Sequence, residues 1–177
     1  PYESCVTWNQ NVLAELFAET PDYVITSQGK ASALVDGQQV GPTAARKALA
    51  DGLRSRWMQL VEAGIGVVVI RDTPWARMQV DLCVSEHLDK LTKCTYEREK
   101  GMAAGGGPTQ LAAFEGSRGI TLVDLNDAIC PAALCPPVIG NVLVYRQGSH
   151  ITATYARSLA PRLEAALATA GLATKDG

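Results

Sequence analysis

The fold is decided by one stretch, Gly66-Val67-Val68-Val69-Ile70-Arg71-Asp72-Thr73-Pro74. Residues 66–70 are continuously apolar and mostly β-branched, which is typical of a strand that is buried on both faces of a sheet. The polar loop 71–74 follows at once and ends the strand. Because a strand of this kind needs helices on both faces, the stretch indicates an α/β protein with a parallel sheet.

Helical patterns lie on both sides of this strand. The apolar spacing predicts a helix over residues 7–19, with Thr7 as its N-cap, and a second helix over 43–63. A closing helix is expected over 152–170, where Pro161 marks a kink or a fresh N-terminus. Each helix follows or precedes a β-rich run, as crossover helices do in a parallel sheet.

The other predicted strands are short. Residues 23–26, 120–125 and 141–145 are β-rich runs, and 141–145 is expected to be the last strand of the sheet. The chain from 81 to 107 reads as irregular apart from a charged helical patch over 96–100, and the glycine-rich stretch 101–108 reads as a flexible connector. That stretch lacks the Lys-Ser/Thr of a phosphate-binding loop, so a nucleotide is not expected there.

Composition narrows the class of protein. The 177 residues are 47% hydrophobic and 19% charged, with a net charge of −2, which indicates one globular domain, here 1–170, with a flexible tail over 171–177. The absence of a basic block argues against nucleic-acid binding. No apolar run approaches the length of a membrane span. The chain opens on Pro1 without Met, so we expect a processed or excised piece of a longer protein.

Four of the five cysteines form two local pairs, Cys83 with Cys94 and Cys130 with Cys135. Local disulfides in an oxidising compartment are the natural interpretation, which favours an extracytoplasmic location. Zinc is the rival interpretation, but no Cys-x-x-Cys occurs, so neither a metal nor a cofactor is expected. Cys5 is left over, and we expect its partner upstream of Pro1.

The most informative single residue is His150, which ends a tight polar turn just before the closing helix. A histidine there can reach a cleft at the carboxyl ends of the strands and act as a general base. The same ends carry Asp72, and also Ser27 and Gln28, where such folds place an oxyanion or substrate contact. A purely structural histidine is the alternative for His150.

Several segments together resemble one family, the SGNH-hydrolase-like domain fused to bacterial membrane O-acyltransferases of the acyltransferase-3 family. The segments are 5–8, 21–25, 69–74, Cys130, Cys135 and 144–156, and the last is the most specific. The resemblance implies a three-layer α/β/α sandwich of the flavodoxin-like kind. It also implies a transmembrane acyltransferase unit in the same polypeptide, and transfer of an acyl group such as acetyl to a hydroxyl of a cell-envelope glycan or glycolipid.

The sequence departs from this family at two places. The Gly-Asp-Ser block that carries the nucleophile is absent, so we expect the serine and the N-terminal strand or strands to lie upstream. Gln147 stands where the family has the acid of its Asp-x-x-His block. The resemblance therefore assigns the base to His150 and an orienting role to Gln147, with Asp72 as a substitute acid.

Two alternatives stay open. A degenerate, non-catalytic SGNH module that binds or positions the acceptor is favoured by Gln147, because an amide cannot stabilise an imidazolium by charge. A secreted esterase is the weaker alternative. By either route, the 177 residues alone are expected to be inactive because they lack the serine block.

Overall fold

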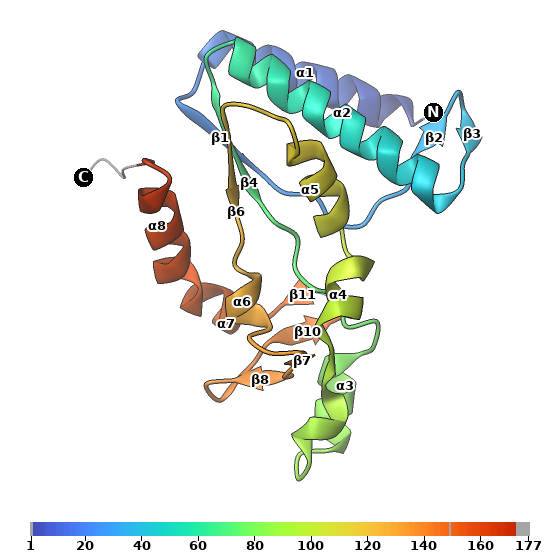
Figure 1. Cartoon of the computed structure of the whole chain (residues 1–177), viewed down its shortest axis with the longest axis vertical. Coiled ribbons are helices and arrows are strands. Elements are labelled where there is room, and N and C mark those ends of the chain that lie inside the picture. Colours follow the sequence, from blue (N-terminus) through green and yellow to red (C-terminus); the bar gives the residue numbers. More distant parts are fainter. Residues whose placement is uncertain (1, 149, 173–177) are drawn as a thin grey trace. The chain divides into compact units, whose positions relative to one another are not determined.

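A computed structural model describes residues 2–148 and 150–172. These residues group into two compact units (Figure 1). Among the described residues, unit 1 comprises 2–27, 31–69 and 109–122, and unit 2 comprises 28–30, 70–108, 123–148 and 150–172. No helix within the described residues combines the length and the apolar character needed to cross a bilayer.

Unit 1 is built around a parallel sheet of three strands in the order β1-β4-β6. Its strands are β1 (Tyr23–Thr26), β4 (Gly66–Ile70) and β6 (Ile120–Val123). β1 pairs with β4 in parallel, with Tyr23 opposite Gly66 and Thr26 opposite Val69. Val67, Val68 and Val69 are buried, which confirms the central strand and the α/β class, with helices on both sides of a parallel sheet.

The helices of unit 1 are α1 (Glu3–Glu19), α2 (Pro42–Glu62) and α5 (Gly107–Phe114). Trp57 and Leu60 of α2 pack in one apolar cluster with Val67 and Val69 of β4 and Ala113 of α5. The Arg54 side chain of α2 donates hydrogen bonds to the carbonyls of Ala112 and Ala113, which joins α2 to α5. Strands β2 (Leu34–Val35) and β3 (Gln38–Gln39) form a hairpin whose turn, Asp36 and Gly37, has positive φ.

The helix prediction over 7–19 was wrong at its start. α1 begins at Glu3, and Thr7 lies one turn inside it rather than at the N-cap. The Thr7 hydroxyl donates a hydrogen bond to the Glu3 carbonyl at 3.1 Å. A threonine that satisfies its hydroxyl on the preceding turn can sit inside a helix, so its presence did not mark the first residue.

Unit 2 consists of short elements. Its helices are α3 (Val80–Glu86), the 3-10 turn η1 (Leu91–Cys94), α4 (Arg98–Ala104), α6 (Asn126–Ile129), α7 (Ala153–Ser158) and α8 (Ala160–Thr169). The prediction of an irregular chain over 81–107 was therefore wrong outside the helical patch over 96–100. The closing helix is confirmed, and it is divided into α7 and α8. Pro161 begins a fresh helix, because it occupies the first turn of α8, where no backbone N–H is needed.

The strands of unit 2 form antiparallel pairs. They are β5 (Tyr96–Glu97) with β7 (Leu134–Cys135), β8 (Val138–Ile139) with β9 (Val142–Leu143), and β10 (Tyr145–Gln147) with β11 (His150–Ile151). A last sheet strand over 141–145 was therefore wrongly predicted. Gly140 and Asn141 both have positive φ, 57° and 63°, and turn the chain back on itself after β8. The predicted strand is thus split between two hairpins.

Candidate active site

The loops that follow β4 and β6 are tied together by polar contacts. Arg71 forms an ion pair of 2.6 Å with Asp124, and its backbone N–H donates to the Val123 carbonyl at 2.8 Å. The side-chain amide of Asn126, which is almost fully buried, donates to the Asp72 carbonyl at 3.1 Å. These contacts fix the position of Asp72, one of the predicted site residues.

The Asp72 carboxylate accepts a hydrogen bond from the backbone N–H of Gly106 at 2.5 Å. A Cβ on Gly106 would lie 2.2 Å from the Gln28 carbonyl oxygen, and one on Gly105 would lie 2.8 Å from Asp72 Oδ2. The prediction of a flexible connector over 101–108 was therefore wrong. The two glycines are needed because backbone packs directly against the loops that carry Gln28 and Asp72.

A buried tyrosine anchors the start of β10. The Tyr145 hydroxyl donates to the Pro74 carbonyl at 2.9 Å and lies 2.8 Å from the Tyr96 hydroxyl. Burial raises the pKa of Tyr145 far above its usual value, and the neighbouring Tyr96 and Asp72 raise it further. Burial also raises the pKa of Tyr96. Sequence reasoning missed this pair, because the two tyrosines are 49 residues apart and no local pattern links them.

His150 and Gln147 are directly opposite one another in the β10–β11 hairpin. Side chains at opposite positions of an antiparallel pair point to the same face, with Cβ atoms about 5 Å apart. The register of this hairpin shifts between Tyr145 and Gln147, and both His150 and Gln147 are exposed to solvent. The turn between them contains Gly148, whose φ is 52° and whose N–H donates to Gln79 Oε1 at 3.3 Å. Ser149 lies outside the described residues.

Thr152 holds the hairpin to the helix that follows it. The Thr152 hydroxyl donates to the Leu143 carbonyl at 2.6 Å and accepts the N–H of Tyr155 at 3.1 Å, which caps α7. The Tyr155 hydroxyl in turn donates to the Ala128 carbonyl. His150 therefore stands on a segment whose backbone is fixed immediately after it.

The remaining predicted residues lie apart from this hairpin in the sequence. Ser27 is exposed and follows β1 in unit 1, whereas Gln28 is half buried and belongs to unit 2. The packing of Gln28 on Gly106 runs through its carbonyl. The catalytic role of His150 and Gln147, the substitute-acid role of Asp72 and the oxyanion role of Ser27 and Gln28 stay predictions.

Both predicted disulfides are present, Cys83–Cys94 and Cys130–Cys135, and Cys5 is free and exposed. His87 is half buried, with Nδ1 3.1 Å from the Cys83 carbonyl. Ligand atoms of Cys83, His87 and Cys94 lie within 4.8 Å of one another. The disulfide leaves neither sulfur as a thiolate, which is the form that binds a metal.

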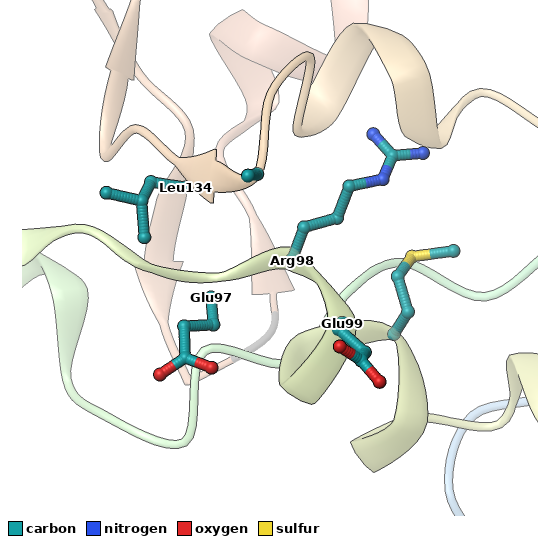
Figure 2. A pocket seen from close by; sticks show the side chains of 6 residues that line it. Glu97, Arg98, Glu99 and Leu134 are labelled. Carbon is teal, nitrogen blue, oxygen red and sulfur yellow. The ribbon is translucent and has the colours of Figure 1, made fainter.

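A separate pocket of about 460 Å³ lies between α4 and β7. Figure 2 shows the carboxylates of Glu97 and Glu99 on one side of the backbone and the Arg98 guanidinium on the other. The guanidinium donates to the Cys130 carbonyl and to Asp127, and Lys100 pairs with Glu97 at 2.6 Å. Because its lining includes none of the predicted catalytic residues, this pocket is not the candidate site.

The chain was compared with known families, curated proteins and solved structures. The family model described as "SGNH domain (fused to AT3 domains)" matches residues 1–165. No curated protein and no solved structure matches. The match spans the central strand, both disulfides and the hairpin that carries His150. The chain therefore belongs to the SGNH domains that are fused to the acyltransferase domains of acyltransferase-3 proteins.

Proposed function

We propose that the protein is the extracytoplasmic domain of a membrane O-acyltransferase. In this proposal it transfers an acyl group, such as acetyl, to a hydroxyl of a cell-envelope glycan or glycolipid. The observation that carries the proposal is the β10–β11 hairpin, where His150 is paired with Gln147 within the region matched by the family model. The transmembrane acyltransferase unit of the same polypeptide is its partner.

The proposed chemistry passes through a serine ester. A serine oxygen attacks the acyl carbonyl, His150 takes the serine proton, and that proton goes to the leaving group of the donor. The acceptor hydroxyl then attacks the ester carbonyl. His150 takes the acceptor proton and returns it to the serine as the ester bond breaks. Since no Gly-Asp-Ser block occurs among the 177 residues, the proposal assigns the serine to another part of the protein.

Gln147 determines the turnover rate that we expect from this site. Its amide oxygen can accept a hydrogen bond from the Nδ1–H of His150 and so orient the ring, but it carries no charge. In the best-studied serine triad, replacing the aspartate by its amide lowers turnover by about 10⁴-fold. We therefore expect slow turnover, with Asp72 as the substitute acid.

Hydrolysis of p-nitrophenyl acetate by the domain in its full-length protein tests the proposal. His150→Ala should abolish hydrolysis, and Gln147→Asp should raise it. His87→Ala and Gln39→Asp are matched controls, because they change the other histidine and a glutamine of the β2–β3 hairpin. If His150→Ala and His87→Ala have the same rate as the unchanged protein, the base has been wrongly assigned.

A non-catalytic module is the second candidate, and Gln147 is the observation that favours it. In that case the folded protein would hydrolyse no ester in any variant, yet it would still bind the acceptor. A secreted esterase is the third candidate, and it would be recovered free of membranes. The extracytoplasmic location is supported by the two disulfides, which persist in oxidising compartments.

A further inference from the structure

A basic pocket lies beside the Gly148 turn in unit 2. Its volume is about 440 Å³, and it is lined by Lys30, Trp75, Arg77, Met78, Gln79 and Gly148. The lining holds two cationic side chains, one aromatic ring and no carboxylate. We propose that this pocket binds an acidic sugar, with its carboxylate on Lys30 and Arg77 and its ring against Trp75. The proposal rests on the proposed function, since it names the acceptor as an acidic glycan.

The backbone displays these side chains by alternation. Ala76 and Val80 are buried in the apolar cluster of unit 2, and Met78 packs against the same cluster. The intervening Trp75, Arg77 and Gln79 are half buried or exposed, and all three line the pocket. The backbone N–H of Trp75 donates a hydrogen bond to the Gly101 carbonyl at 3.0 Å. The segment is therefore anchored on one side and presents a cation, an amide and an indole on the other.

The two cations are available to an anion. Lys30 Nζ lies 4.5 Å from the centroid of the Trp75 ring. Neither Lys30 nor Arg77 forms an ion pair with another residue of the ranges 2–148 and 150–172. By contrast, Arg71 and Arg98 of the same unit are paired with Asp124 and Asp127. A carboxylate in the pocket would receive two charge-assisted contacts without breaking an ion pair.

Arg77 is held in a strained conformation. Its φ is 56°, in the left-handed region that favours glycine. Non-glycine residues that keep such a conformation often cluster at binding sites, where the fold around them compensates for the strain. Here Ala76 and Met78 fix the backbone on either side of Arg77. Replacing Arg77 by glycine should therefore relieve the backbone strain and remove the cation in one step. A binding role for Arg77 predicts that affinity falls in this variant, whereas a purely structural role does not.

The pocket adjoins the proposed catalytic hairpin. Gln79 lines it and also accepts the N–H of Gly148, the residue that follows Gln147. A second pocket, of about 370 Å³, shares Gln79 and is lined further by Asp81, Leu82, Arg146 and Gln147. A glycan whose acidic sugar occupied the basic pocket could extend along this second pocket. Asp81 and Arg146 carry opposite charges in this second pocket, so its lining does not by itself require the next sugar to be neutral.

Trigalacturonate binding to the 177-residue chain tests the proposal. The indole N–H signals of the three tryptophans are followed by NMR, and Trp75→Phe identifies the signal of Trp75. We expect the Trp75 signal to shift with saturation while those of Trp8 and Trp57 stay in place. Maltotriose, which is neutral, should shift it far less. If maltotriose binds equally well, or if inorganic phosphate does so as a general anion, the acidic-sugar proposal is overturned.

Arg77→Gly is the decisive variant, because glycine accepts the backbone conformation that strains arginine. We expect trigalacturonate affinity to fall about tenfold or more, while the melting temperature rises by about 2–4 °C. Asn141→Gly is the matched control, since Asn141 also has positive φ but does not line the pocket. It should leave affinity unchanged. Unchanged affinity in Arg77→Gly would overturn the proposal.

The failure of this proposal and that of the proposed function are distinguishable. His150→Ala should keep trigalacturonate binding whether or not His150 is a base. Binding without any ester hydrolysis would leave the pocket in place and contradict catalysis. Hydrolysis that depends on His150, with no binding of trigalacturonate, would contradict only the pocket.

Discussion

Unit 1 and unit 2 are stabilised by different means. The core of unit 1 is apolar side chains on long, regular elements, with Trp57 and Leu60 of the 21-residue α2 packed on β4. Unit 2 has strands of two or three residues, and it contains both disulfides of the described chain and the Tyr96–Tyr145 pair. The difference places nearly the whole predicted site in the unit with the shorter elements, since every predicted site residue except Ser27 belongs to unit 2.

The largest expected effect is in unit 1. Trp57→Ala should lower the free energy of unfolding by about 3–5 kcal/mol, because a buried indole is replaced by a cavity. Trp57 is 3% exposed, whereas Trp8 is 63% exposed, so Trp8→Ala is the control and should change little. Urea unfolding measures the total. Hydrogen exchange of peptides from both units shows whether unit 2 keeps its protection, and equal loss in both would remove the contrast between them.

The next effect is in unit 2. Removing either disulfide by a double Cys→Ser replacement should cost about 2–3 kcal/mol, because each restricts the unfolded chain. The pairs are Cys83–Cys94 and Cys130–Cys135, and Cys5→Ser is the control. Thermal unfolding with and without a dithiol reductant measures the difference. If the reductant lowered the hydrogen-exchange protection of unit 1 peptides before that of unit 2 peptides, unit 2 would not be the unit that depends on the disulfides.

A smaller effect is expected from the buried tyrosine. Tyr145→Phe should cost about 1–3 kcal/mol at neutral pH, because the Pro74 carbonyl loses its donor. Burial raises the pKa of Tyr145, so the folded protein keeps a proton that the unfolded chain releases above about pH 10. This contribution to stability is complete below about pH 10 and is lost as the pH rises further, by about 1.4 kcal/mol per pH unit.

Urea unfolding between about pH 9 and 11.5 measures that slope. Tyr145→Phe should flatten it, and Tyr2→Phe, at an exposed position, should not. Burial raises the pKa of Tyr96 and Tyr155 as well, so part of the slope should remain. An unchanged slope in Tyr145→Phe would mean that the hydroxyl is not desolvated.

The smallest effect returns to unit 1 and has the opposite sign. Gly52 lies inside α2, and a Cβ there would meet nothing within 4 Å. Gly52→Ala should therefore raise the free energy of unfolding by about 0.5–1 kcal/mol. Gly116→Ala is the contrasting variant, because its φ of 75° is unfavourable for alanine. If Gly52→Ala destabilised the protein, α2 would not be a regular helix with open space at position 52.

Sequence reasoning found unit 1 far better than unit 2. The helix over 43–63 and the strand over 66–70 were predicted to within a residue, because long apolar periodicity is a local signal. In unit 2 the Gly140–Asn141 turn and the Gly105–Gly106 packing were missed. Both depend on what the backbone meets after folding, which no local pattern records. His150 was found from its place at the end of a polar turn, the family resemblance added Gln147, and their pairing in one hairpin came from the structure.

The two disulfides also bear on the order in which this chain acquires its structure. Each joins cysteines close in sequence, with separations of 11 and 5 residues. Short loops close quickly and at high effective concentration, so both bonds can form in an oxidising environment before distant parts of the chain have met. The parallel pairing of β1 with β4 must instead wait for residues 23–26 and 66–69 to find one another. The part of the chain that carries the proposed site can thus be cross-linked first. Once both local disulfides have formed, mispairing would mainly involve the free thiol of Cys5.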